Sequence, residues 1–151
     1  FIFLGGIVAV GLWSDVRDTV APRQSLMQDG AEVVVPMDRD GHFYLTLEVN
    51  GVPVRFVVDT GATEIVLSGQ DAARVGIAAN DLIFSGRAFT ANGMVATAPV
   101  RLERVALGGI VDQGVRAVVN EGDLEESLLG MSYLNRFERL EISRGQMVLE
   151  R

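Results

Sequence analysis

An acid, a hydroxyl and a glycine end one of the most apolar runs of the chain. The run Val52–Val58 reads VPVRFVV, and Asp59, Thr60 and Gly61 follow it directly. The run predicts a buried strand, so the carboxylate of Asp59 should lie at the edge of the core. Gly61 lets a second stretch of backbone come close, and the hydroxyl of Thr60 can bond a backbone group where no water reaches. A carboxylate held in such a place can take up or release a proton during catalysis.

Few other residues are suited to chemistry. The chain has no Cys and a single His, His42, which the pattern puts at the surface beside a turn. A thiolate nucleophile and a zinc site are therefore excluded. Ser132 lacks the second Gly of a nucleophile elbow. The DRDG of Asp38–Gly41 is similar to the start of a calcium loop, but Leu47 occupies the position of its Glu, so we predict a turn there and no metal or cofactor.

The composition indicates one folded domain that is rich in strands. The chain has 151 residues, of which 48% are apolar and 17 are Gly. These values suit a single core built from short strands and tight turns. The formal net charge is −7, and the 13 basic residues, all Arg, form no cluster. This argues against a nucleic-acid partner.

The first residues differ from the rest of the chain. Phe1–Trp13 is uniformly apolar, and we predict that residues 1–13 are the C-terminal part of a membrane anchor, with Trp13 at the interface. A buried strand or helix of the domain and the core of a signal peptide are the alternatives. Residues 14–31 are polar and predict a linker, which leaves residues 32–151 for the domain.

Hydrophobic alternation and turn residues divide the domain into about nine short strands and two short helices. The predicted strands are Glu32–Met37, His42–Val49, Val52–Val58, Glu64–Ser68, a hairpin within Phe89–Ala106, one or two strands within Gly109–Val119, and the pair Glu138–Ser143 and Gln146–Glu150. The predicted helices lie within Ser68–Gly76 and Ser127–Phe137. Asn50-Gly51, Asn92-Gly93 and Arg144-Gly145 are the predicted hairpin tips. This pattern is typical of a mostly β barrel or sandwich.

Three features in this order resemble the retropepsin-like aspartic proteases, in particular their bacterial membrane-anchored members. They are VVDTGAT at Val57–Thr63, the Asn92-Gly93 hairpin at the place of the flap, and LLG at Leu128–Gly130 before a short helix. The resemblance covers roughly Val33 to Leu149. It implies a closed β-barrel with one or two short helices, the single lobe of the acid protease fold.

The resemblance also implies the site and the partners. Asp59, Thr60 and Gly61 would form the catalytic loop, and because the chain has one such loop, a homodimer would bring two copies of Asp59 together. The residues expected to bind the protein or peptide substrate, in the loop and in the flap, are Ala62, Thr63, Ala91, Asn92, Gly93 and Met94. Leu128 and Leu129 are expected in the core.

The chain departs from the retroviral pattern at one charge network. Where an Arg commonly follows the LLG-type glycine, this chain has Met131, and Thr63–Ile65 lacks the Asp with which that Arg pairs. The dimer must therefore be held without this pair.

The resulting hypothesis is a homodimeric aspartic endopeptidase of the bacterial inner membrane. Its domain would face the periplasm and cut extracytoplasmic or membrane-associated proteins. A non-catalytic module that keeps the fold for peptide binding or dimerisation is the main alternative. The intact Asp59, Thr60 and Gly61 argue against it. Another alternative is a peptidase that is monomeric and latent until it is crowded on a membrane.

Overall fold

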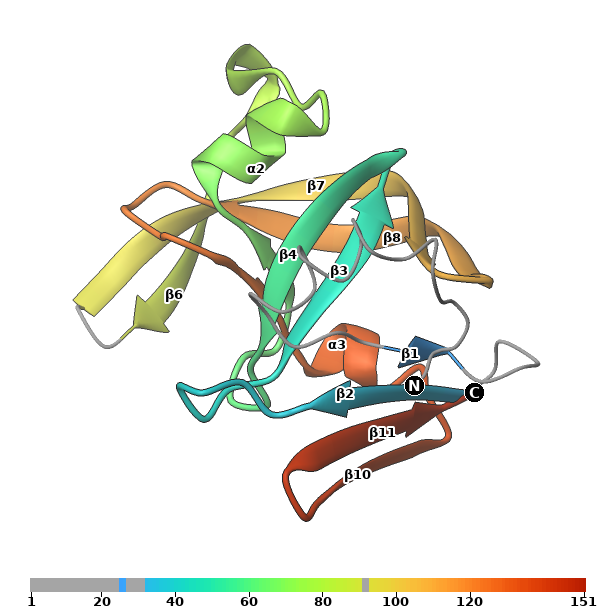
Figure 1. Cartoon of the computed structure of the whole chain (residues 1–151). Helices are drawn as coiled ribbons and strands as arrows, with labels where there is room; N and C mark the ends of the chain where they lie inside the picture. The colour runs from blue at the N-terminus through green and yellow to red at the C-terminus, as the bar shows by residue number, and fades with distance from the viewer. Residues whose placement is uncertain (1–24, 27–31, 91–92) are drawn as a thin grey trace, which may run out of the picture.

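The computed structural model describes residues 25–26, 32–90 and 93–151. The predicted anchor, most of the predicted linker, and Ala91 and Asn92 of the predicted flap lie outside these ranges. The described part is mostly β, as predicted, with two short α-helices and one turn of 3-10 helix (Figure 1). No helix within it is both long and apolar enough to span a membrane.

The elements follow the predicted order closely. The strands are β1 (Ser25–Leu26), β2 (Glu32–Pro36), β3 (Tyr44–Val49), β4 (Val52–Val58), β5 (Ile65–Leu67), β6 (Gly86–Thr90), β7 (Gly93–Leu107), β8 (Ile110–Asn120), β9 (Ser127–Leu129), β10 (Arg139–Ser143) and β11 (Gln146–Glu150). The helices are α2 (Gly69–Arg74), η2 (Ala79–Asp81) and α3 (Met131–Leu134). The main differences are the long β7, and β6, which begins three residues before the predicted hairpin.

Six strands close into a barrel. The larger sheet has the order β3-β4-β9-β5-β8-β7-β6, and β3 also pairs with β7. This extra pairing joins Glu48–Val49 to Val105–Ala106 and completes the ring. The seventh strand, β6, pairs only with the first part of β7, and this hairpin projects from the barrel (Figure 1).

Alternation of side chains fills the barrel. In β3, Leu45, Leu47 and Val49 are buried, and the residues between them face solvent. The turn to β4 uses Asn50 and Gly51, both with positive φ (52° and 85°), as the predicted two-residue hairpin requires.

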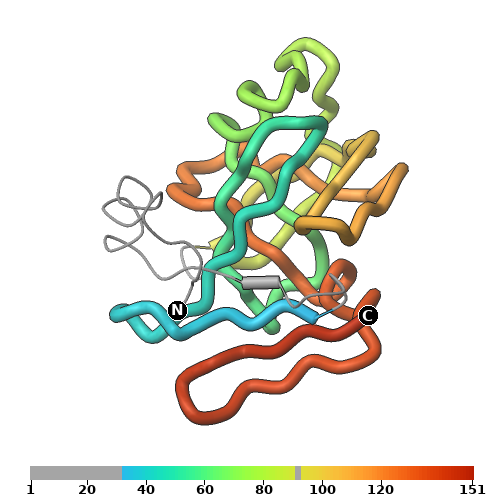
Figure 2. The backbone as a smooth tube through the Cα atoms, turned by 45° about the vertical axis from the view of Figure 1, so that its right-hand side comes forward, coloured from blue at the N-terminus to red at the C-terminus, as the bar shows by residue number. Residues whose placement is uncertain are grey.

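A smaller sheet lies below the barrel, with α3 between them (Figures 1 and 2). Its order is β1-β2-β11-β10, so the last strand of the chain lies between two others. β1 brings two residues of the predicted linker into this sheet. Val33, Val35, Met147 and Leu149 are fully or almost fully buried in the same core as the barrel residues. The two sheets therefore share one hydrophobic core.

A cluster of charges ties β8 to the end of the chain. Arg151 donates to both carboxylate oxygens of Asp112, at 3.0 and 2.7 Å, and Arg136 donates to the same carboxylate at 3.3 Å. The side chain of Asp112 is 11% exposed, and the guanidinium of Arg151 lies 4.8 Å from the centre of the Phe137 ring. The hydrogen bond from Arg151 holds the pKa of Asp112 below its usual value.

We expect the Asp112→Asn variant to lose stability in a pH-dependent way. At pH 7 its free energy of unfolding should fall by about 1–3 kcal/mol, because two arginines lose an ionised acceptor. A lowered carboxyl pKa stabilises the fold above the ordinary value of about 4, and this contribution is lost as the pH falls through the lowered pKa. Urea unfolding of parent and variant at pH 7 and pH 3 should show the difference narrowing in acid.

The matched control is Glu48→Gln. Glu48 lies 3.9 Å from Arg104, and both side chains are about half exposed. Its removal should change the free energy of unfolding by less than about 0.5 kcal/mol. A deficit of Asp112→Asn that stays constant down to pH 3 would contradict the assignment.

Candidate active site

The backbone holds Asp59 at the end of β4. The Asp59 amide donates to the carbonyl of Leu129 at 3.0 Å, which continues the pairing of β4 with β9. The Gly61 amide donates to Oδ1 of Asp59 at 2.9 Å, and the Ala62 amide donates to the Asp59 carbonyl at 3.1 Å. These bonds orient the carboxylate, and no described residue binds its other oxygen.

The loop that follows Asp59 rests on α3. The first two amides of that helix, of Met131 and Ser132, donate to the carbonyls of Ala62 and Thr63 at 2.9 and 2.8 Å. Amides in the first turn of a helix have no partner inside it, so these bonds satisfy them and anchor the loop. Gly130 lies at the contact, and a Cβ there would stand 2.3 Å from the Glu64 carbonyl and 2.7 Å from that of Ala62.

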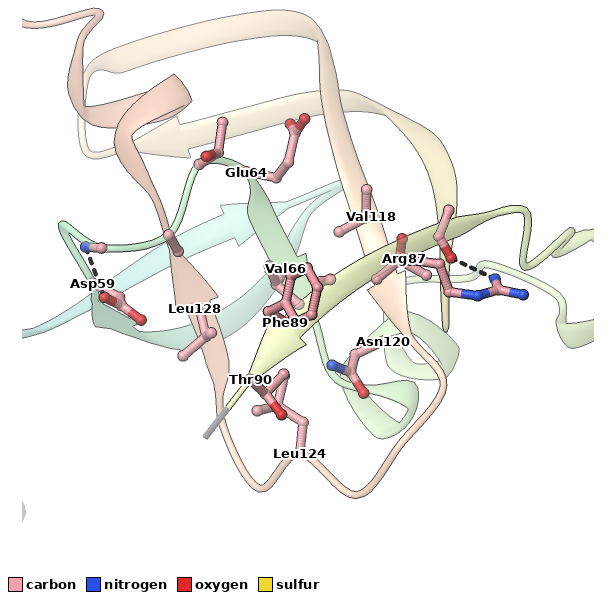
Figure 3. A pocket seen from close by; sticks show the side chains of 16 residues that line it. Asp59, Glu64, Val66, Arg87, Phe89, Thr90, Val118, Asn120, Leu124 and Leu128 are labelled. Carbon is pink, nitrogen blue, oxygen red and sulfur yellow. Dashed lines mark hydrogen bonds between the residues drawn. The ribbon is translucent and has the colours of Figure 1, made fainter. Parts of the chain in front are cut away.

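A groove of about 740 Å³ opens beside Asp59 (Figure 3). Cavities of this size hold small ligands or several residues of a peptide. The residues that line it come from the Asp59 loop, β5, β6, the first part of β7, the last part of β8, the loop that joins β8 to β9, and β9: Asp59, Gly61, Ala62, Thr63, Glu64, Val66, Gly86, Arg87, Ala88, Phe89, Thr90, Thr97, Val118, Asn120, Leu124 and Leu128.

The groove floor is a row of apolar side chains on adjacent strands. Val66 of β5 pairs in register with Leu128 of β9 and with Val118 of β8. Leu128 was expected in the core with Leu129. The structure separates the two, because side chains alternate along a strand: Leu129 is fully buried, and Leu128 faces the groove.

Four of the predicted loop residues, Asp59, Gly61, Ala62 and Thr63, line the groove. The fifth, Thr60, is exposed and lies outside the lining.

The predicted flap residues Gly93 and Met94 begin β7 and do not line the groove either. Met94 is 55% exposed. Met94 pairs across the hairpin with Phe89 of the edge strand β6, and of the two only Phe89 lines the groove. Ala91 and Asn92 lie outside the described residues.

The sequence-based reasoning missed several groove residues. Phe89, 86% exposed, follows a segment without clear alternation. Asn120 had a usable signal: it follows Val118 and Val119, as Asp59 follows Val57 and Val58. A polar residue that follows a Val-Val pair at the end of a strand lines the groove in both places.

The residues that the sequence excluded lie where they were predicted. His42 is exposed, and its ring meets that of Tyr44 edge-on, with 6.5 Å between the ring centres. Asp38 and Asp40 form a turn: the Gly41 amide donates to the Asp38 carbonyl at 2.9 Å, and the His42 amide donates to Oδ1 of Asp40 at 2.8 Å.

A closed barrel, with an Asp-Thr-Gly loop anchored beside a groove and a projecting hairpin, defines the aspartic protease class in its one-lobe form. The chain belongs to the retropepsin-like aspartic proteases, and its residues 45–136 match the family described as "gag-polyprotein putative aspartyl protease". The predicted family and fold class are thus confirmed.

Solved structures similar to this chain include other proteases of the retropepsin-like fold. A retropepsin-like aspartic protease from Rickettsia conorii is 36% identical, with a TM-score of 0.73 over 85% of this chain and 93% of that one. EIAV protease, solved with an inhibitor, shares the fold at 20% identity, with a TM-score of 0.53 over 62% of this chain and 85% of that one.

An uncharacterized protein of Rickettsia prowazekii (strain Madrid E) is 35% identical over 89% of this chain and 58% of its own length. The chain spans between 51% and 58% of the curated relatives that it matches.

We expect Gly130→Ala to destabilise the protein. The added Cβ would meet two backbone carbonyls, which cannot move without breaking the anchor of the Asp59 loop. The free energy of unfolding should fall by at least about 2 kcal/mol in urea titrations. Gly69→Ala is the control, since a Cβ at Gly69 meets nothing within 4 Å. Equal stability of the two variants would show that Gly130 is not required.

Proposed function

We propose that the chain is an aspartic endopeptidase that works as a homodimer. The observation that carries this is the Asp59 carboxylate, which lies at one end of the groove with one oxygen bound by the Gly61 amide. Family membership supports the proposal, because the retropepsin-like lobe contributes one such acid.

Acid chemistry of this kind needs a second carboxyl group. Glu64 is the only other acid that lines the groove among the described residues, and in Figure 3 its carboxylate points away from that of Asp59. Thr60 and Gly61, at the tip of the loop, are exposed in a single chain. A second copy, related by a two-fold axis beside this loop, would supply the missing Asp59.

Two facing carboxylates share one proton, which is a general property of aspartic proteases, because ionising both at close range is costly. The ionised Asp59 takes a proton from a water molecule held between the pair. The protonated Asp59 of the partner polarises the scissile carbonyl, and the water attacks it directly. The pair then protonates the leaving amine.

The groove suits an extended peptide. Its floor is made by the apolar row Leu128, Val66 and Val118, and β6 lies along one side. β6 is an edge strand, so a peptide could add to it by backbone hydrogen bonds with alternate side chains in the groove. Phe89, exposed on β6, would cover the bound chain.

The cellular site is a proposal from composition alone. If Phe1–Trp13 ends a membrane anchor, the domain would be tethered at the bacterial inner membrane on the periplasmic side. Its substrates would then be extracytoplasmic or membrane-associated proteins.

We expect Asp59→Asn to abolish peptidase activity, because an amide cannot accept the proton of the attacking water. Cleavage of a peptide library, followed by mass spectrometry from acid to neutral pH, should fall at least about 1000-fold. Asp81→Asn, a change at an exposed acid in η2, should leave it unchanged. Equal cleavage by Asp59→Asn and the parent would refute the aspartic mechanism.

The two-copy site predicts that inactive subunits are inhibitory. Adding an equal amount of Asp59→Asn chain to a fixed amount of parent should lower activity to about half, because random pairing leaves fewer dimers with two intact acids. Equal addition of Asp81→Asn chain should not lower it. Full activity in a sample that sediments strictly as a monomer would rule out the shared site.

A further inference from the structure

The apolar floor of the groove ends at a polar side chain. Asn120 lies two residues after Val118 on the same face of β8, and both line the groove. Val119, between them, is fully buried in the core. The row of Leu128, Val66 and Val118 crosses the strands, and Asn120 lies to one side of it, next to Val118 along β8 (Figure 3). A side chain that packs on the row can therefore turn toward Asn120 at its β8 end.

The orientation of the Asn120 amide follows from its neighbour. Its Oδ1 accepts a hydrogen bond from the backbone amide of Gly122 at 2.7 Å. A backbone amide can only donate, so the oxygen must face Gly122 and the NH2 group must face the other way. In Figure 3 this nitrogen is on the groove side of the side chain.

The NH2 group is held in place without a partner. Asn120 is 7% exposed, and no described residue accepts a hydrogen bond from its nitrogen. A nearly buried donor that faces a groove gains most from a ligand that brings an acceptor, since leaving it unpaired under a bound ligand is costly.

We propose that Asn120 is a specificity-determining residue, which donates a hydrogen bond to the terminal carbonyl of a glutamine-like substrate side chain. The methylene groups of that side chain would pack on the apolar row, and its carboxamide oxygen would meet the Asn120 nitrogen. This assignment rests on the proposed peptidase function.

The charges around the groove favour a neutral carboxamide over a carboxylate. Asp59 and Glu64 line the groove, and Glu121 and Asp123, in the loop that follows Asn120, are exposed. Arg87, the one cation in the lining among the described residues, donates instead to the carbonyls of Phe84 and Gly86, at 3.3 and 2.8 Å. Lysine and arginine side chains would bring a donor to a donor, which the Asn120 nitrogen disfavours.

The Asn120→Asp variant separates recognition from folding. It keeps the oxygen that accepts from Gly122 and replaces the groove-facing NH2 group by an oxygen. In a proteome-derived peptide library read by mass spectrometry, the parent should prefer Gln over the similarly shaped Met by about fivefold at one position near the cleaved bond. In Asn120→Asp this preference should vanish at the same position, and Lys and Arg should gain by a similar factor.

Two further variants control for charge and shape. Asn80→Asp makes the same change in η2, outside the groove lining, and should leave the profile as in the parent. Asn120→Leu removes donor and acceptor alike and should favour Met over Gln. If it folds poorly, the comparison of Asn120→Asp with Asn80→Asp is sufficient.

The outcomes separate this proposal from the peptidase proposal. Cleavage by all variants with one unchanged profile, or with a loss equal for every peptide, overturns side-chain recognition by Asn120 and leaves the peptidase intact. If the parent cleaves nothing, the peptidase proposal fails. Peptide recognition by Asn120 is then tested by binding: the same library is passed over immobilised parent and immobilised Asn120→Asp chains, and the retained peptides are compared. Enrichment of Gln-containing peptides on the parent but not on Asn120→Asp supports the role of Asn120, and identical or empty sets of retained peptides overturn it.

Discussion

The position of β9 between β4 and β5 is the constraint on which the site depends. β9 runs parallel to β4 and antiparallel to β5, so the loop that joins those two strands must cross the end of β9. Gly130 occupies the crossing, where a side chain would meet backbone carbonyls. The first two amides of α3 then hold the loop by donating hydrogen bonds to the carbonyls of Ala62 and Thr63. The Asp59 carboxylate is thus positioned by backbone contacts within one chain, before any partner or substrate binds.

The fold could be predicted from the sequence where the signal is local. The alternation in Tyr44–Val49 and the positive-φ pair Asn50-Gly51 determine the first hairpin almost completely. The place of β9 could not be read in the same way, because three residues, Ser127–Leu129, carry no period and their partners lie about seventy residues earlier in β4. For the same reason the pattern could not assign Leu128 to the groove and Leu129 to the core.

The same local arrangement of a strand end and a turn occurs at two places in the groove. β4 ends with Val57-Val58 and is followed by Asp59, β8 ends with Val118-Val119-Asn120, and each polar residue lines the groove. In each case the backbone amide two residues later donates a hydrogen bond to one side-chain oxygen. The Gly61 amide lies 2.9 Å from Oδ1 of Asp59, and the Gly122 amide lies 2.7 Å from Oδ1 of Asn120. Each loop thereby fixes one oxygen and leaves the other polar atom turned away from that loop. In the proposed mechanism that atom of Asp59 would serve proton transfer, and in the proposed recognition that of Asn120 would act as a donor.

The smaller sheet limits how two copies can meet. Every residue of β11 pairs with β10 on one side and with β2 on the other, so β11 has no free edge for a second chain. The adjoining β10 carries Arg139, which binds carboxylates of Glu32, Glu141 and Glu150, and such charges discourage edge pairing. The proposed dimer would therefore rely mainly on the surface around the Asp59 loop. Confinement by the proposed N-terminal anchor would raise the local concentration of chains and would favour assembly of the proposed two-acid site.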